Sequence, residues 1–227
     1  MNLLQTRRFA EMFSESIEGA ARAASLPWSV VGPGEIPRPG EWDRFTHLLL
    51  SGSEASALLP QPWEQELRTL VAAWAASGKP GLGICYGHQF LAKVLLGPQS
   101  LRRSSTPEFG FVRTRFAPHP LFEGLGDAFF FNAHMEEVHR LPEHGRVLAA
   151  TDRCPIQAVA YGPGPLVGVQ FHPEFDRLQG EEILRSLGRS PRPTPAPEGG
   201  AGRVVLGRFL RLRPGPGRGQ PEPPGVR

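Results

Sequence analysis

At the start of the chain, hydrophobic and polar positions alternate first with helical periodicity and then with the pattern of strands. In residues 7–24 apolar side chains recur every three to four positions among good helix formers, which predicts an amphipathic helix. Residues 28–32 and 45–52 are short apolar runs, as in buried strands. Residues 62–77 open with proline and end before Gly78, which predicts a second helix.

The same alternation continues before the pattern changes to strands alone. Residues 81–85 predict a strand and residues 87–97 a helix closed by glycine. Strand-like segments and one last helix follow, at residues 109–116, 127–134, 146–151, 156–161, 166–172 and, for the helix, 179–189. This order predicts an α/β fold: an open, mostly parallel twisted sheet flanked by helices (flavodoxin-like), with an antiparallel extension.

The composition changes sharply near residue 190. Residues 190–227 hold nine prolines and eight glycines, with seven arginines against two glutamates. Such a composition buries too little apolar surface to offset the loss of chain entropy. We therefore expect one folded domain over residues 1–189 and a mostly disordered, solvated tail over residues 190–227. Nucleic-acid binding by the basic tail is a remote alternative.

The cysteines and the apolar runs limit where the protein can reside. Cys85 and Cys154 are the only cysteines and form no CxxC pair or disulfide framework, which favours a reducing, cytoplasmic setting. No run of about 18 apolar residues occurs, so no membrane span is expected. The first residues mix charges throughout, unlike a secretory signal. Cys154 is expected to be a packed, inert thiol before a strand.

Cys85 lies between a predicted strand and a predicted helix, in the sequence GICYGHQ. Its G-x-C-x-G pattern is the thiol counterpart of the nucleophile elbow, in which flanking glycines permit a sharp strand-to-helix turn. A helix amino terminus favours a thiolate, and the amide of Tyr86 would point toward an oxyanion formed by attack from the sulfur. A buried, inert thiol is the alternative that this pattern alone leaves open.

A cysteine nucleophile needs a base, and His172 stands apart among the seven histidines. It ends the most apolar of the late strands, in the sequence GVQFHPE. Residues two apart on an extended chain face the same side, so Glu174 accompanies His172. The carboxylate can then accept a hydrogen bond from one ring nitrogen while the other nitrogen faces the thiol.

Taken together, GICYGHQ and GVQFHPE resemble the two signatures of class I glutamine amidotransferase domains, of the kind joined to GMP synthase. The segment HLLLSGSEAS resembles the family's oxyanion turn and the strand before it, and the resemblance spans roughly residues 28–187. It implies that Cys85 attacks the side-chain amide of glutamine, leaving a γ-glutamyl thioester and releasing ammonia. His172 would act as general base and acid, oriented by Glu174.

The resemblance also implies residues that bind the substrate. Gly52 and Tyr86 would donate backbone amides to the oxyanion, and Gln89 would help to hold the glutamine. His134 matches a histidine in a family loop beside the glutamine pocket, although a histidine on a surface loop explains the sequence as well. We expect no metal and no cofactor, because the other histidines lack metal-ligand spacing.

The implied product, ammonia, needs an acceptor, so a separate synthetase subunit is the expected partner. A γ-glutamyl peptidase using the same triad is one alternative, and a binding module without turnover is another. Two departures from the family pattern favour the latter. The oxyanion turn reads Ser51-Gly52-Ser53-Glu54 where the family commonly has Ser-Gly-Gly-Pro, so a positive φ at Ser53 would strain it. The family's first strand also has no counterpart, which exposes a position at the sheet edge.

Overall fold

The computed structural model describes residues 1–38, 40–162, 164–191 and 200–215, and its centre is a seven-stranded sheet. The order is β1-β2-β7-β6-β5-β3-β4. The strands are β1 Leu48–Leu50, β2 Gly81–Ile84, β3 Leu101–Phe116, β4 Ala128–Val138, β5 Arg146–Ala150, β6 Ala158–Ala160 and β7 Leu166–Val169. β1, β2 and β7 run parallel, whereas the other four pairings are antiparallel. The α/β class and the open sheet are therefore as predicted, whereas the expectation of a mostly parallel sheet is wrong, because the antiparallel extension makes up most of the pairings.

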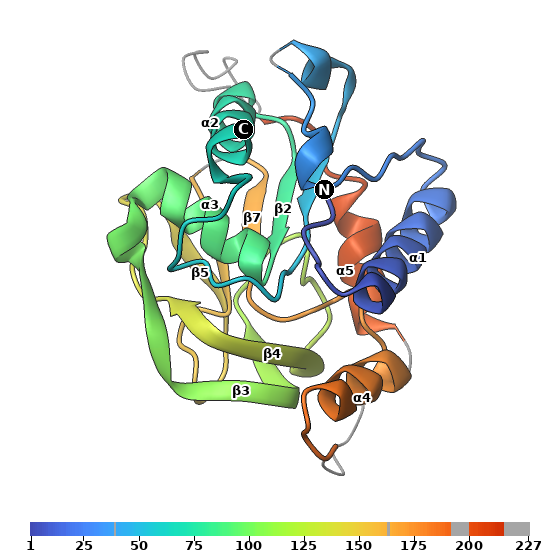
Figure 1. Ribbon diagram of the computed structural model, residues 1–227, viewed down its shortest axis with the longest axis vertical. Helices are drawn as coiled ribbons and strands as arrows, with labels where there is room; N and C mark the ends of the chain where they lie inside the picture. The colour runs from blue at the N-terminus through green and yellow to red at the C-terminus, as the bar shows by residue number, and fades with distance from the viewer. Residues whose placement is uncertain (39, 163, 192–199, 216–227) are drawn as a thin grey trace.

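Helices cover both faces of the parallel strands. Figure 1 shows α2 and α3 on one side of these strands and α1 and α5 on the other. α4 packs against the long β3-β4 ribbon. No helix in the described part of the chain is long and apolar enough to cross a membrane. The helices are α1 Arg7–Ala23, α2 Glu64–Ser77, α3 Tyr86–Leu96, α4 Arg177–Ser186 and α5 Ala201–Phe209, with 3₁₀ turns at Pro33–Glu35, Glu41–Arg44 and Pro98–Ser100.

Glycines on the α3 side of the sheet bring this helix unusually close to β2 and β7. A Cβ atom on Gly83 would lie 2.5 Å from the carbonyl oxygen of Gly87, and one on Gly168 would lie 2.2 Å from Nδ1 of His88. On the opposite face of β2, Leu82 is buried in the core beneath α1 and α5. The alternation of glycine and large apolar residues therefore sets α3 directly against the end of β2.

Helix α5 contradicts the expected disordered tail. Val205, Leu206 and Phe209 are at most 2% exposed and share a core with Ile84. Their spacing places them on one helical face, which covers the sheet, but the prolines and glycines on either side conceal this signal in the average composition. The expectation for residues 190–227 is wrong for Ala201–Phe209; residues 192–199 and 216–227 lie outside the described residues.

The predicted strand at residues 28–32 is also wrong, because this run forms no strand and is not buried. The chain instead places Met1 and Leu3 along β1. The amide of Ser51 donates to the Met1 carbonyl at 3.0 Å, and the amide of Leu3 donates to Oγ of Ser51 at 2.6 Å. The sheet edge that we expected to be exposed is therefore partly covered.

Candidate functional site

Cys85 occupies a strained turn between β2 and α3, with φ 50° and ψ −103°. Among the described non-glycine residues, only Ser25 shares a positive φ. Such a backbone costs about 1–3 kcal/mol and persists only where its surroundings enforce it. The amide of Cys85 donates to the Val169 carbonyl at 2.8 Å, and the amide of Gly87 donates to the Ser51 carbonyl at 3.1 Å. These bonds hold the sulfur above the carboxyl ends of the parallel strands, at the amino terminus of α3.

His172 and Glu174 follow β7 and face the same region. Nδ1 of His172 lies 2.8 Å from Oε1 of Glu174, and both side chains are buried. Burial opposes a charge on the ring, but the carboxylate of Glu174 and the nearby sulfur of Cys85 outweigh it and raise the pKa of His172 to about 10. The ring is therefore a cation at neutral pH, and it can release a proton only to a group that becomes strongly basic.

Gly52 lies close to both Cys85 and His172. A Cβ atom built on Gly52 would lie 2.9 Å from Cε1 of His172 and 3.6 Å from Cβ of Cys85. Only a glycine leaves room for this approach. Ser53 does not have a positive φ, so the strain that we expected in this turn is absent.

The other predicted oxyanion and substrate residues lie beside the elbow. Tyr86 begins α3 directly after Cys85, and its ring is buried in the core. Nε2 of Gln89 donates to the Glu136 carbonyl at 2.8 Å and to Oε1 of Gln170 at 3.1 Å. Nε2 of Gln170 lies 3.6 Å from Sγ of Cys85. Gln170 was not among the residues predicted from the sequence, although it stands two residues before His172 and thus on the same side of the extended chain.

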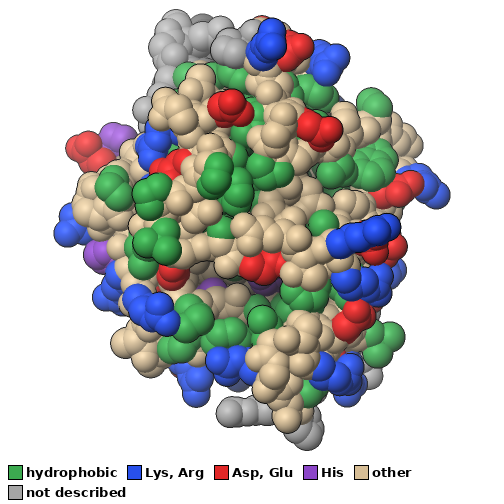
Figure 2. Space-filling model, viewed as in Figure 1, with side chains coloured by type: hydrophobic (Ala, Val, Ile, Leu, Met, Phe, Trp, Pro, Cys, Tyr) green, Lys and Arg blue, Asp and Glu red, His purple; other side chains and the backbone are tan. Residues whose placement is uncertain are grey.

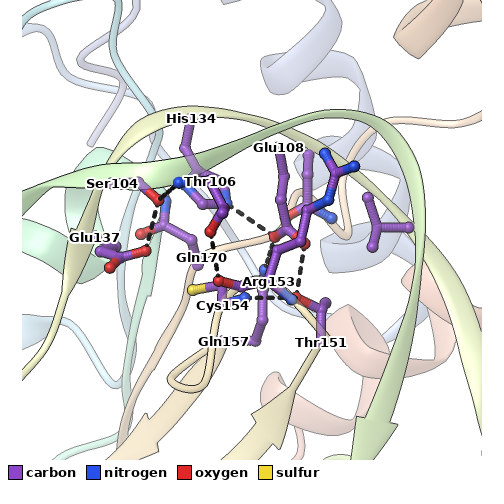
Figure 3. A network of polar contacts seen from close by, with 12 residues as sticks. Ser104, Thr106, Glu108, His134, Glu137, Thr151, Arg153, Cys154, Gln157 and Gln170 are labelled. Atoms are coloured by element: carbon purple, nitrogen blue, oxygen red, sulfur yellow. Dashed lines mark hydrogen bonds and ion pairs between the residues drawn. The ribbon is translucent and has the colours of Figure 1, made fainter.

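His134 lies in β4 and is buried, so the surface-loop interpretation is wrong. Figure 3 shows it within a network of polar contacts. Nε2 lies 3.1 Å from Oε2 of Glu108, and Nδ1 lies 3.2 Å from the Glu136 carbonyl. Glu108 also accepts from Thr151 Oγ1 at 2.6 Å and from Gln157 Nε2. Gln89 of α3 donates to the same Glu136 carbonyl. The network is therefore connected to the site through Gln89.

Glu108, His134 and Cys154 bring potential ligand atoms within 4.8 Å of one another. Cys154 is fully buried, and burial together with the charge of Glu108 raises its pKa to about 12, so it is the packed thiol that we expected. Both oxygen atoms of Glu108 already accept hydrogen bonds, and a cation would have to displace these donors. The cluster is better suited to stabilising the junction of β3, β4 and the β5-β6 turn than to binding a metal.

Exposed apolar side chains lie on the loop between β1 and α2 and on β4. Leu58, Leu59 and Met135 are 40%, 61% and 45% exposed. The loop and β4 are joined here, because the amide of Ala57 donates to Oε2 of Glu136 at 2.8 Å. Figure 2 shows hydrophobic side chains gathered on this view of the molecule, above a hollow in which histidine surface is visible.

Comparison with known proteins gives a consistent result. A family model described as glutamine amidotransferase class-I matches residues 37–187. Over 113 residues the chain is 38% identical to a GMP synthase [glutamine-hydrolyzing] subunit of Pyrococcus abyssi, a match that covers 48% of this chain and 59% of that protein. The corresponding protein of Ignicoccus hospitalis is 34% identical over 175 residues, with 76% and 86% covered. The chain spans only 31% of the Thermus thermophilus GMP synthase that it matches at 36% identity.

Solved structures share the fold. A glutamine amidotransferase from Thermotoga maritima superposes with a TM-score of 0.72 at 21% identity, covering 86% of this chain and 92% of that one. A glutamine amidotransferase from Methylobacillus flagellatus gives a TM-score of 0.70 at 20% identity, with 88% and 91% covered.

Proposed function

The chain belongs to the class-I glutamine amidotransferase family, as its two motifs indicate, and we propose that it hydrolyses the side-chain amide of glutamine to glutamate and ammonia. The catalytic residues in this proposal are Cys85, His172 and Glu174. The observation that supports it most is the meeting of Cys85 and His172 against Gly52, while His172 is hydrogen-bonded to Glu174 at 2.8 Å.

The first half-reaction forms a thioester. The Cys85 thiolate attacks the carboxamide carbon, and the carbonyl oxygen becomes an oxyanion that accepts from the backbone amides of Gly52 and Tyr86. His172 gives its proton to the departing nitrogen. The carbon–nitrogen bond then breaks, releasing ammonia and leaving a γ-glutamyl thioester.

The second half-reaction restores the enzyme. His172 is now neutral and takes a proton from water, which attacks the thioester carbon. The carbon–sulfur bond breaks, and glutamate leaves as Cys85 and His172 return to the thiolate and imidazolium. Glu174 accepts the hydrogen bond from Nδ1 of His172 and holds the ring in place. In this scheme Gln89 and His134 contribute to the glutamine pocket, the first directly and the second through the Glu136 carbonyl that both residues contact.

Ammonia needs an acceptor, and we propose that a separate synthetase polypeptide supplies it, because similar chains are named as one subunit of GMP synthase. A cytoplasmic location fits this role and fits two free thiols.

The test is the release of glutamate and ammonia from glutamine by the wild-type chain and by Cys85→Ala. Turnover by the wild type that Cys85→Ala lacks supports the proposal. A γ-glutamyl peptide offered in a parallel assay distinguishes the peptidase alternative. Preference for the peptide over glutamine contradicts the proposed substrate, whereas failure on both contradicts catalysis by this site.

A further inference from the structure

Three consecutive backbone positions carry the candidate base and its carboxylate, and each contacts a different element. The amide of His172 donates to the Phe131 carbonyl in β4 at 2.8 Å. Oγ of Ser16 in α1 donates to the Glu174 carbonyl at 2.7 Å. Between them, α5 touches Pro173, because a Cβ atom on Gly202 would lie only 2.0 Å from the Pro173 carbonyl oxygen.

The contact at Gly202 involves no flexible side chain that could move aside. The same added Cβ would lie 2.9 Å from the carbonyl carbon of Pro173, so backbone meets backbone. Since real Cβ atoms are not found this close to an oxygen, any side chain at position 202 must displace either α5 or the segment between His172 and Glu174.

Helix α5 is itself held firmly in the core. Val205 and Phe209 are completely buried, and Phe13 of α1 lies in the same core. After the helix, the amide of Gly215 donates to the Gly78 carbonyl at 2.9 Å, which ties the end of the described chain to the loop before β2. A displacement at Gly202 is therefore more easily taken up by the start of α5 or by the Pro173 peptide than by a shift of the whole helix.

We propose that α1 and α5 together form a positioning bracket for the His172–Glu174 pair, with α5 acting through Gly202 at Pro173 and α1 acting through Ser16 at Glu174. This inference rests on the proposed function and extends it, because it makes a segment outside the two motifs necessary for the geometry of the site. Neither helix touches the reacting atoms. Their effect is to fix the side chains on both sides of Pro173 relative to Cys85.

Gly202→Ala is the direct test, and the helix provides its own control. In Gly207→Ala the new methyl group meets only Nη1 of Arg211 at 3.5 Å, an ordinary contact. For glutamine hydrolysis we expect kcat of Gly202→Ala to fall by about 10²-fold, as when a catalytic group is misplaced by about 1 Å. KM should change little, since Gln89 lies on α3 and not on the bracket. Gly207→Ala should keep the wild-type kcat.

A second pair of variants tests the α1 contact without adding any atom. Ser16→Ala removes the hydrogen bond to Glu174, and kcat should fall about fivefold, as expected for one lost hydrogen bond. Ser14→Ala is the control, because the Ser14 hydroxyl donates to the Ala10 carbonyl and accepts from Nδ2 of Asn2 at 3.2 Å, so its removal leaves the bond to Glu174 intact. If Gly202→Ala does not fold, Ser16→Ala and Ser14→Ala provide the test. Equal kcat values for these two variants would then contradict the proposal.

The pH dependence of Cys85 alkylation by iodoacetamide separates this inference from the proposed function, because it needs no turnover. Alkylation requires the thiolate, so it responds to the position of the neighbouring ring of His172. We expect the pH profile to shift in Gly202→Ala but not in Gly207→Ala, while Cys154 remains unlabelled in both. A shift in a protein that does not hydrolyse glutamine would contradict the proposed substrate and retain the bracket. If Gly202→Ala and Gly207→Ala both fold and have the same alkylation profile and the same kcat, the positioning bracket is contradicted.

Discussion

Oε1 of Glu174 accepts a hydrogen bond from Nδ1 of His172 at 2.8 Å inside a site that excludes most water. Burial alone would keep the ring neutral, yet the carboxylate and the Cys85 sulfur raise the pKa of His172 to about 10. The pair therefore holds a proton next to the Cys85 sulfur at neutral pH. In the proposed reaction this proton is the one that the leaving ammonia requires.

Replacement of Glu174 by glutamine should remove the charge and keep the shape. The pKa of His172 then falls, and the alkaline limit of kcat moves to lower pH, together with a loss of about 10⁴-fold in kcat, as for the loss of a triad carboxylate. A pH–rate profile from neutral pH to above the pKa of about 10 measures both effects. Glu182→Gln serves as the control, since it breaks only an exposed pair with Arg8 and should leave the profile unchanged.

The same pairing predicts how stability depends on pH. The folded pKa of His172 is raised above its unfolded value of about 6.5, so the folded state binds the extra proton between these values. The stabilisation is fully present below about pH 6.5 and is lost as the pH rises through about 10. Urea unfolding at about pH 7 and about pH 10 should therefore show a larger alkaline decrease in the wild type than in Glu174→Gln. Equal decreases would contradict a charged ring in the folded protein.

The strained backbone at Cys85 predicts a difference between two inactive variants. Cys85→Ala and Cys85→Gly both lack the sulfur, but only glycine adopts φ 50° without steric cost. We expect the free energy of unfolding of Cys85→Gly to exceed that of Cys85→Ala by about 1–2 kcal/mol, the cost of a positive φ for residues with a Cβ atom. Denaturant titration of both proteins measures this difference. A more stable alanine variant would mean that the turn relaxes when the sulfur is removed.

Glu54 should position the oxyanion turn in place of the family's usual proline. Its two carboxylate oxygens accept from the backbone amides of Gln5 and Thr6 at 2.8 Å and 2.9 Å, which ties the turn to the start of α1. Glu54→Ala should lower kcat/KM by about tenfold, less than the roughly 10²–10³-fold that follows loss of an oxyanion donor. Glu11→Ala removes an exposed carboxylate of α1 and should have no such effect. Equal activities would leave Glu54 without a role in the turn.

His88 should make the fold sensitive to acid. Complete burial, with a smaller contribution from His134, lowers the pKa of His88 to about 3. The unfolded chain binds a proton below about pH 6.5 while the folded protein does not, so stability falls as the pH drops. Between about pH 7 and pH 5 this decrease amounts to about 2 kcal/mol. In urea unfolding, the free energy of unfolding of His88→Leu should decrease less on acidification than that of the wild type. His144→Leu, at an exposed position, should keep the wild-type slope.

Local patterns were sufficient for most of the sheet and for the elbow. The segments around Leu82 and Val167 are short apolar runs bounded by glycine and proline, and such runs predict buried strands whatever surrounds them. Cys85 is flanked by the glycines that its turn needs, and His172 stands two residues before Glu174. In each case the physical requirement lies within a few residues, so a short stretch of sequence displays it.

The error over α5 arose because composition averages over a segment. Three apolar side chains at Val205, Leu206 and Phe209 are enough to bury one face of a short helix, yet they are outnumbered by prolines and glycines nearby. The opposite error occurred at residues 28–32, where an apolar run found no neighbouring strand to pair with. Both outcomes depend on what the rest of the chain places beside the segment.

The family and the α/β class could be recognised from the sequence alone, and the triad of Cys85, His172 and Glu174 could be proposed from it, because local spacing carries these features. Three other relationships emerged only in the folded chain: Gln170 reaches Cys85, Glu108 pairs with His134, and α5 presses on Pro173. These contacts join positions 26 to 85 residues apart. A hydrogen bond or a close backbone approach over such separations leaves no periodic trace in either segment, so it exists only once the sheet has brought the segments together.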